Sequence, residues 1–330
     1  MKVIENIIKV FLGIVILYAF CHYFFIFKDV VLSIGAKRNL TGKIVYSINA
    51  LKVKVIELPS GEKKTIYKAE ETADKYLEHV LNPYFSPSGR KIVFTKMPID
   101  AALRYRLYMM DTDGTNVKKI LDLGDASISS PSWSPDGSKI AFVVKDKGLE
   151  GLYIIDAYNP SDYKRICAIE PARAQPAWSP DSQKVVFISE ELYRSKIGDN
   201  LYAEKDLGGA YIVEFYENRV RKIIEYASEV SWSPDSKSLI CKKGDGYYLI
   251  TLTDNGYTKD IQRIIPYETP IYGKPGSLPI RWSPDGKYIV FCKDIWFGFT
   301  GIYVAPIDNP KKHIRIATDG TDIVGMSWVR

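Results

Sequence analysis

Apolar and polar residues alternate in short runs along most of the chain from residue 41 onward, and tight-turn sequences separate the runs. Between residues 138 and 169 the pattern predicts three strands, SKIAFVV, GLYIID and YKRICAI. A shorter strand around Trp133 precedes them, and the turn Ser134-Pro135-Asp136-Gly137 joins it to the second strand. Pro suits the second turn position, and Gly tolerates a positive φ. The segment therefore predicts one four-stranded antiparallel unit.

This unit is repeated along the chain. The copies are NPYFSPSGRKIVFTK (82–96), SPSWSPDGSKIAFVVK (130–145), QPAWSPDSQKVVFIS (175–189), EVSWSPDSKSLICKK (229–243), PIRWSPDGKYIVFCK (279–293) and a truncated VGMSWVR (324–330). Their aromatic marks are Phe85, Trp133, Trp178, Trp232, Trp282 and Trp328, so successive spacings by subtraction are 48, 45, 54, 50 and 46 residues. A period near fifty residues indicates stacked units that bury their apolar faces against one another.

The first and last segments complete each other. Residues 41–68 supply three strands without an innermost one, and VGMSWV near the C-terminus supplies that missing strand. Counting this composite unit predicts an all-β, six-bladed propeller of four-stranded antiparallel blades. The residues nine positions after each mark should pack between neighbouring blades: Phe94, Phe142, Phe187, Cys241 and Phe291.

The run Pro-x-Trp-Ser-Pro-Asp-Gly-x-x-Ile-x-Phe resembles the TolB-type β-propeller repeat, and also the propeller domain of prolyl oligopeptidase and dipeptidyl peptidase relatives. The resemblance covers about residues 40–330. It implies a scaffold that binds protein partners, as TolB does through its propeller. The chain departs from TolB in lacking a separate α/β domain before the propeller, so a TolB-specific partner is not carried over. The repeat serves proteins with different functions, so the resemblance specifies the fold more sharply than the function.

The N-terminal segment differs from the rest. Residues 10–27 read VFLGIVILYAFCHYFFIF, without a formal charge, and are long enough to span a bilayer as a helix. We expect a signal anchor or transmembrane helix at 1–27, a linker at 28–40 and the propeller at 41–330. A cleaved signal is the alternative, although the nearest cleavage candidate, Ile34-Gly35-Ala36, is poor. The resemblance to exported propellers favours an extracytoplasmic domain, periplasmic or at the cell surface.

Charge and motifs exclude several functions. The net charge of +6 is distributed along the sequence without a focused basic stripe, so no nucleic-acid partner is expected. The chain contains no Gly-x-Ser-x-Gly elbow, Walker loop, His-Glu-x-x-His or Cys-x-x-Cys motif, so we expect no catalytic residue, cofactor or metal site from known motifs. Cys241 and Cys292 should face either each other or away from each other, and buried free thiols are favoured over a disulfide.

Loop lengths distinguish the two faces of the ring. Connections between the first and second and the third and fourth strands are tight turns; we call this side the tight-turn face. The long segments leave the other side, the long-loop face, and carry the expected partner-binding aromatic residues: Tyr193, Tyr202, Tyr267, Tyr272, Trp296, Phe297 and Phe299. The alternative is that these side chains only cap the ends of blades. Because the chain enters and leaves on the tight-turn face, that face should look toward the membrane.

Two hypotheses for function follow. The first is a membrane-anchored, extracytoplasmic scaffold that binds a protein or peptide through its long-loop face. The second is an enzyme, a lyase or hydrolase acting on a glycan or peptide at the mouth of the central tunnel, with candidates His79, Arg173, Glu229 and Arg281. A cluster of His, acid and base at the mouth would favour the enzyme, whereas aromatic loops without such a cluster favour binding.

Overall fold

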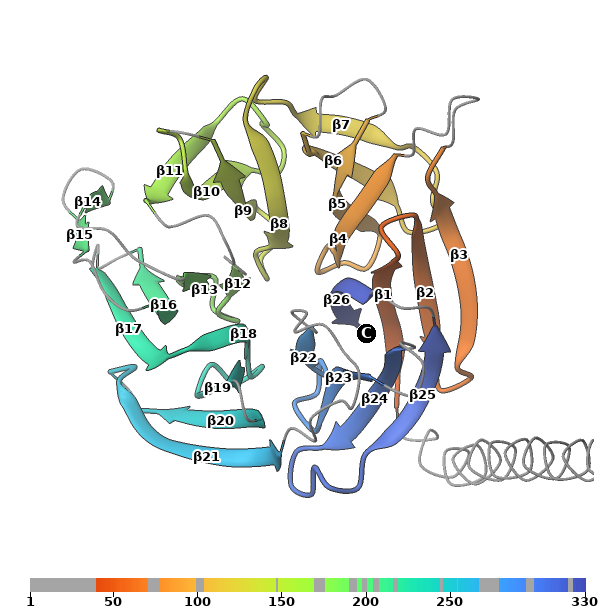
Figure 1. Cartoon of the computed structure of the whole chain (residues 1–330), viewed down its shortest axis with the longest axis vertical. Helices are drawn as coiled ribbons and strands as arrows, with labels where there is room; N and C mark the ends of the chain where they lie inside the picture. Colours follow the sequence, from red (N-terminus) through yellow and green to blue (C-terminus); the bar gives the residue numbers. More distant parts are fainter. Residues whose placement is uncertain are drawn as a thin grey trace, which may run out of the picture.

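The computed structural model describes residues 40–70, 78–98, 104–146, 148–168, 176–189, 195–197, 201–203, 208–215, 219–243, 246–253, 255–266, 279–294, 300–319 and 323–330. These residues form six four-stranded antiparallel sheets arranged as blades around one axis (Figure 1). The predicted six-bladed propeller is confirmed. In the third blade, the strands expected at 151–156 and near Trp133 are found, and the fourth strand ends at Cys167, two residues earlier than expected.

Each blade is given from its innermost to its outermost strand. Blade 1 comprises β26 (Ile323–Val329), β1 (Gly42–Ile48), β2 (Lys52–Leu58) and β3 (Glu62–Lys68). Blade 2 comprises β4 (His79–Phe85), β5 (Lys91–Met97), β6 (Arg106–Asp111) and β7 (Lys118–Leu121). Blade 3 comprises β8 (Ser127–Trp133), β9 (Lys139–Lys145), β10 (Gly151–Asp156) and β11 (Tyr163–Cys167). Blade 4 comprises β12 (Ala177–Trp178), β13 (Lys184–Ser189), β16 (Gly209–Glu214) and β17 (Arg219–Glu225). Blade 5 comprises β18 (Ala227–Trp232), β19 (Ser238–Lys243), β20 (Gly246–Leu252) and β21 (Thr258–Pro266). Blade 6 comprises β22 (Ile280–Trp282), β23 (Tyr288–Asp294), β24 (Thr300–Pro306) and β25 (Ile314–Asp319).

The Ser-Pro-Asp turns owe their shape to a repeated set of hydrogen bonds. In blade 3, Ser134 Oγ donates to Asp136 Oδ1 at 2.6 Å and accepts from the backbone N–H of Lys139 at 2.8 Å. The same two bonds recur around Ser233 and Ser283. Partial burial raises the pKa of Asp136, but the hydrogen bonds from Ser134 and Ser138 outweigh burial and leave that pKa below its ordinary value. These aspartates therefore form the turns, as the sequence predicts.

Buried side chains gather in six clusters, each shared by two neighbouring blades. Phe94 packs with Val45, Val53 and Val55 of blade 1, and Phe187 packs with Ala141 and other residues of blade 3. The residues predicted to pack between blades are all fully buried or nearly so: Phe94, Phe142, Phe187, Cys241 and Phe291. Because every interface has its own cluster, each blade depends on both of its neighbours.

Cys241 and Cys292, whose relative orientation the sequence did not decide, face away from each other. Cys241 belongs to the cluster between blades 4 and 5, whereas Cys292 belongs to the cluster between blades 6 and 1. Both are free thiols, as is Cys167. Burial raises the pKa of the Cys241 thiol to about 12, so it packs as a neutral apolar group.

The C-terminal strand closes the ring. β26 pairs with β1 in antiparallel register from Lys43↔Val329 to Ile48↔Ile323. Its side chains reach the next blade as well, because Ser327 Oγ accepts from the backbone N–H of Phe85 at 2.9 Å. Trp328 Nε1 donates to the carbonyl of Thr41 at 3.0 Å. The composite first blade is therefore confirmed.

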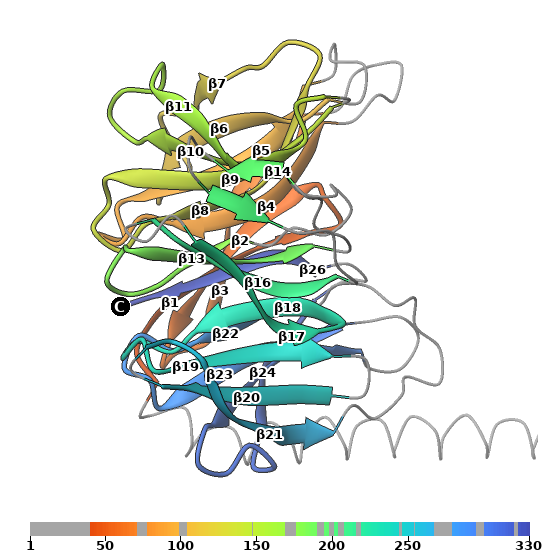
Figure 2. The ribbon, with the colours of Figure 1, turned by 90° about the vertical axis from the view of Figure 1, so that its left-hand side faces the viewer.

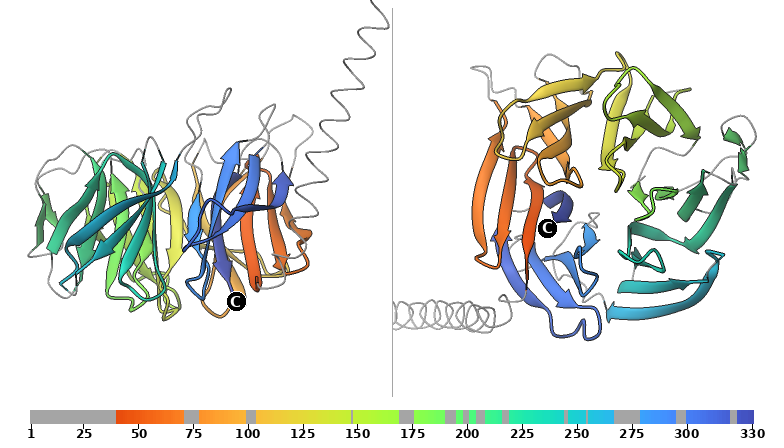
Figure 3. Two further views of the ribbon diagram at one scale, coloured as in Figure 1. Left: turned by 90° about the horizontal axis from the view of Figure 1, so that it is seen from below. Right: turned by 180° about the vertical axis from the view of Figure 1, so that it is seen from behind.

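Both ends of the described chain lie on the tight-turn face. Gly42 pairs with Leu58 just before the turn to β3, and Lys43 pairs with Val329, so the start of β1 and Arg330 share one side of the ring. The side views place the C-terminus at this face of the disc (Figures 2 and 3). The predicted anchor at 10–27 lies outside the described residues. Within the described ones, no helix is long and apolar enough to cross a membrane.

Candidate functional site

Most of the predicted partner-binding residues lie outside the described part of the chain: Tyr193, Tyr267, Tyr272, Trp296, Phe297 and Phe299. Tyr202 is placed by its backbone alone, in β15 (Leu201–Ala203), which pairs with β14 (Ser195–Ile197). This hairpin contacts the outermost strands of two neighbouring blades, since β15 meets β17 and β14 meets β11. The sequence predicted only a long loop here. The assignment of these seven residues to partner binding stays a prediction.

Three of the four tunnel candidates are described, and they lie at different levels of the ring. Each innermost strand runs from the long-loop face to its aromatic mark at the tight-turn face. His79 is the first residue of β4, six positions before its mark, whereas Glu229 lies three and Arg281 one position before theirs. At about 3.3 Å per residue, five positions separate His79 from Arg281 by roughly 16 Å along the axis. Arg173 lies outside the described residues. The three described candidates therefore lie at different levels along the axis of the ring instead of at one end.

Glu229 and Arg281 are the two candidates that the fold brings together. Arg281 Nη1 lies 3.6 Å from Glu229 Oε2, and the two side chains are 12% and 2% exposed. The pair joins the innermost strands of blades 5 and 6. Arg281 also acts electrostatically on Tyr84 of blade 2, lowering a pKa that burial raises by a larger amount. Blades 6 and 2 are not neighbours, so this influence acts across the ring.

Bulges shape the innermost strands around this axis. Asn82 and Ser130 have φ values of 53°, and Gly325 has a φ of 68°, each three positions before its mark. The strand registers shift at these positions. A Cβ on Gly325 would lie 2.4 Å from Asn82 Cα, so only glycine allows the two bulges to touch. Such bulges aim side chains away from the regular ladder.

A buried ion pair fixes the interface of blades 1 and 2 at the long-loop face. Lys96 Nζ lies 2.5 Å from Glu78 Oε1, and the Tyr67 hydroxyl donates to Glu78 Oε2 at 3.0 Å. Burial alone would lower the pKa of Lys96, but contacts with Glu78 and Tyr67 outweigh it and raise that pKa to about 12. Next to this pair, His79 Nδ1 lies 3.2 Å from the Tyr105 hydroxyl.

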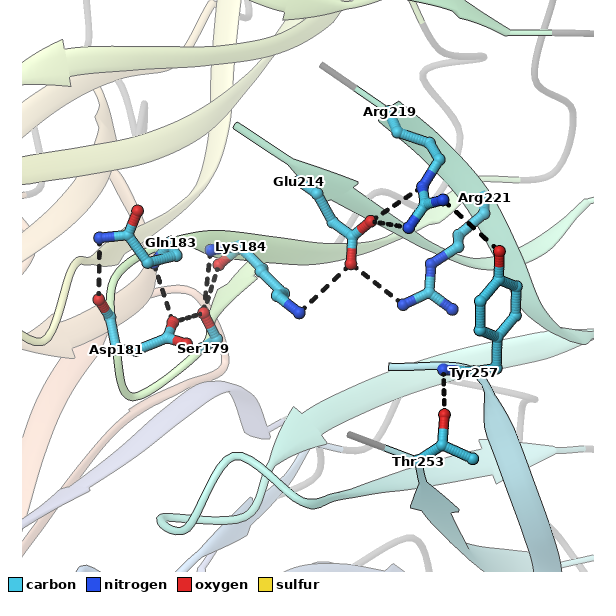
Figure 4. A network of polar contacts seen from close by, with 9 residues as sticks. All are labelled: Ser179, Asp181, Gln183, Lys184, Glu214, Arg219, Arg221, Thr253 and Tyr257. Carbon is cyan, nitrogen blue, oxygen red and sulfur yellow. Dashed lines mark hydrogen bonds and ion pairs between the residues drawn. The ribbon is translucent and has the colours of Figure 1, made fainter. Parts of the chain in front are cut away.

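A second charged network fastens blade 4 to blade 5 at the tight-turn face (Figure 4). Glu214 is 4% exposed and accepts from Arg219 at 2.9 Å and Arg221 at 3.1 Å, with Lys184 Nζ at 3.2 Å. The ring of Tyr257 from blade 5 lies under Arg221, 4.8 Å from the guanidinium carbon to the ring centre. Burial raises the pKa of Glu214, but the surrounding cations outweigh it and leave that pKa below its ordinary value. Sequence reasoning missed this network, because Glu214, Arg219 and Arg221 come from outer strands that the repeat does not specify.

Hydrogen bonds and ion pairs within the protein thus hold the turns of the tight-turn face, whereas the long segments connect strands at the opposite face. Chemically, the described innermost strands offer a carboxylate paired with a guanidinium, a distant imidazole and a phenol. No group of three or more His, Cys, Asp or Glu side chains within the described residues is placed to hold a metal ion. Among the described residues, the candidates His79, Glu229 and Arg281 do not form one cluster.

Comparison with known proteins agrees with this geometry. The family described as TolB beta propeller domain matches residues 96–247. The Tol-Pal system protein TolB of Methylococcus capsulatus is 31% identical over 97 residues, which cover 29% of this chain and 23% of the relative. An uncharacterised protein of Agrobacterium fabrum is 43% identical over 68 residues, covering 18% of this chain and 23% of that protein. The aligned segments thus span less than a quarter of either relative.

Solved structures support the same fold. TolB from Acinetobacter baumannii superposes with a TM-score of 0.65 at 16% identity, covering 87% of this chain and 66% of that one. An oligogalacturonate lyase in complex with manganese gives a TM-score of 0.53 at 14% identity, over 80% of this chain and 74% of the lyase. At such identities the likeness concerns the fold alone. The repeat, the six blades and these comparisons together identify the described part of this chain as a six-bladed β-propeller of the TolB type.

Proposed function

We propose that this protein is a membrane-anchored, extracytoplasmic scaffold that binds a protein or peptide partner through its long-loop face. One observation carries the proposal: both ends of the described chain lie on the tight-turn face, and internal hydrogen bonds and ion pairs close that face. The opposite face carries the long segments, and binding residues concentrate in long loops on a rigid scaffold. The similarity to a protein named as part of the Tol-Pal system supports a protein partner.

The membrane part of the proposal comes from the sequence. Residues 10–27 carry no formal charge and match the length of a bilayer-spanning helix. Twelve residues separate them from Leu40, the first described residue, which is buried beside blade 1. This short connection keeps the tight-turn face near the membrane and turns the long-loop face outward.

Protease accessibility tests the topology. Protease added to intact cells or spheroplasts that make the full chain should degrade the propeller, while a fragment containing residues 10–27 stays with the membrane. Immunoblots against both parts measure this result. Complete protection of the propeller until lysis would place the domain in the cytoplasm and contradict the proposal.

Substitution of the loop aromatics tests the working face. We expect the triple variant Trp296→Ser, Phe297→Ser and Tyr202→Ser to melt close to the parent protein, because changes at exposed positions cost little stability. Capture of the partner from membranes should weaken, since truncation of an interface anchor costs about 2 kcal/mol, roughly thirtyfold in affinity. Quantitative pull-down with the full chain in detergent measures the loss.

The matched control changes two tight-turn residues, Asn255→Ser and Asn309→Ser. Both lie in turns between third and fourth strands, and capture should be unaffected. If these changes abolish capture and the aromatic changes do not, the assignment of faces is wrong. If the aromatic variant fails to fold, these side chains belong to the core, and the proposed surface loses its support.

A further inference from the structure

The tight-turn face is not evenly charged around the ring. Its turn segments run from the Ser after each aromatic mark to the first residue of the second strand, and from the last residue of the third strand to the second residue of the fourth. In blades 6, 1 and 2 these segments carry nine Lys or Arg and five Asp or Glu side chains: 283–288, 306–315, 58–63, 86–91 and 111–119. In blades 3 to 5 their described residues carry six of each kind: 134–139, 156–164, 179–184, 214–220, 233–238 and 252–259. The positive excess therefore lies in one half of this face, the turn segments of blades 6, 1 and 2, which we call the basic sector.

Much of this positive charge is not neutralised within the protein. Five exposed cations of the basic sector have no ion pair with a carboxylate among the described residues: Arg90, Lys118, Lys287, Lys311 and Lys312. Cations of the opposite half are neutralised more closely, since Lys184 and Arg219 both pair with Glu214. The five cations come from four separate turn segments, so the sequence shows no basic run although the fold gathers them on one side of the ring.

The chain joins the ring inside the basic sector. Blades 6, 1 and 2 follow one another around the ring (Figure 1), and Leu40 is buried in the cluster between blades 6 and 1. Beside Leu40, the half-buried side chains of Trp328, Tyr288 and Pro284 line a small pocket at the same face. Trp and Tyr together with Lys and Arg are the side chains that anchor proteins at the interface between membrane and water.

An anionic lipid surface suits this arrangement better than a single small anion. The five cations lie in blade 2 and blade 6, on both sides of the point where the chain enters blade 1, so one small ion cannot contact them all. A layer of lipid phosphates offers negative charge over the whole width of the sector. Each Lys or Arg close to an anionic leaflet strengthens binding about fivefold.

We propose that the basic sector docks on the headgroup layer of anionic lipids, in the same membrane that residues 10–27 enter. This inference rests on the proposed function, which anchors the chain in that membrane and turns the tight-turn face toward it. Twelve connecting residues can extend to about 40 Å, so the connection alone lets the ring leave the surface. Contact between the basic sector and lipid phosphates holds the ring against the membrane and keeps the long-loop face directed outward.

Lysine acetylation tests this contact with the full chain reconstituted in lipid nanodiscs. Mass spectrometry follows the rate at which an uncharged reagent acetylates each lysine, in discs of phosphatidylcholine and in discs that also contain phosphatidylglycerol. We expect Lys287, Lys311 and Lys312 to react about fivefold more slowly when phosphatidylglycerol is present. Salt at about 1 M should remove the difference, because it shortens the Debye length to about 3 Å. Lys164 and Lys237, exposed lysines in the turns of blades 3 and 5, are internal controls and should keep their rates.

Three outcomes would overturn the proposal. Equal acetylation rates in the two kinds of disc would show that lipid does not cover the basic sector. Equal protection of Lys164 and Lys237 would show that the whole face responds to the lipid and the sector has no special part. Inorganic phosphate that protects the three lysines as well in phosphatidylcholine discs would assign them to a free anion instead of a lipid surface.

Two variants with the same change of charge assign the contact to the basic sector. The first replaces three of its lysines: Lys287→Gln, Lys311→Gln and Lys312→Gln. The matched control replaces three exposed lysines of blades 3 and 5: Lys164→Gln, Lys237→Gln and Lys259→Gln. Protection of Lys118, in blade 2, should be lost in the first variant and kept in the control, and both should melt close to the parent because all six positions are exposed. Loss of this protection in both variants, or in neither, would contradict the assignment.

The lipid contact and the proposed function fail separately. If protease added outside cells degrades the propeller while acetylation rates are equal in the two kinds of disc, the extracytoplasmic scaffold stands and the lipid contact is wrong. If the propeller is protected until lysis while phosphatidylglycerol slows acetylation of the three lysines, the lipid contact stands and the extracytoplasmic location is wrong.

Discussion

Deletion of residues 323–330 should abolish cooperative folding of the propeller. The deletion removes β26, the whole innermost strand of blade 1, together with Ile323 and Met326, which are 2% and 0% exposed. It also removes the hydrogen bond from Phe85 to Ser327 and leaves β1 with an unpaired inner edge. Burial of each large apolar side chain contributes about 1.5–3 kcal/mol. Loss of this strand therefore approaches the whole stability of a typical domain, about 5–15 kcal/mol.

Thermal unfolding followed by circular dichroism measures the result, and we expect a broad transition or insoluble protein. The synthetic peptide IVGMSWVR, added in excess, should restore a cooperative transition in part, because it offers the missing strand to the open edge. A scrambled peptide of the same composition is the control. A truncated protein that melts like the full chain would refute closure of the ring by β26.

Glu214→Gln should be the most damaging single change at the tight-turn face. The carboxylate neutralises three cations, and Arg221 among them is 12% exposed. Removal of one partner of a buried ion pair costs about 3–5 kcal/mol, and exposure of Lys184 and Arg219 reduces this to about 3 kcal/mol. The matched control is Glu57→Gln, whose partner Lys43 is 44% exposed; a surface pair of this kind contributes about 1 kcal/mol or less.

The pH dependence of this effect has a definite sign. The folded-state pKa of Glu214 lies below the ordinary value of 4.5, so its contribution to stability is complete above that value and is lost as pH falls through the folded pKa. The difference in unfolding free energy between parent and variant should therefore be full at pH 7 and shrink below about pH 4.5. Urea unfolding at pH 7 and pH 3 measures it. A difference independent of pH would show that the network acts through packing alone.

The repeat made the blades predictable because the same physical demand recurs in each one. In blades 2 to 6 an aromatic mark ends the innermost strand, a Ser-Pro turn follows, and an apolar residue nine positions after the mark packs against the preceding blade. These features depend on local sequence and on the neighbouring blade, so five tandem copies specified them. The β14–β15 hairpin escaped prediction because Ser195–Ile197 and Leu201–Ala203 are too short to show an alternating pattern.

The candidate site was predictable only in part. Glu229 and Arg281 lie on innermost strands just before their aromatic marks, but their contact depends on how side chains of the neighbouring blades 5 and 6 are oriented, which periodicity does not encode. His79 is six positions before its aromatic mark, at the other end of its strand, so the structure does not bring it together with Glu229 and Arg281. The bulges at Asn82 and Ser130 had a local signal, since each precedes a proline, but a proline alone does not distinguish a bulge from a regular strand.

The completion of blade 1 by β26 also sets the order of events during synthesis. Blades 2 to 6 can assemble progressively as the chain leaves the ribosome, each against the one before it, but blade 1 stays one strand short until residues 323–329 emerge. Until β26 pairs with β1, the ring is open between blades 6 and 1, and the interface between these two blades is incomplete. The last strand of the ring to be made, β26, therefore completes a ring whose first strand is β1.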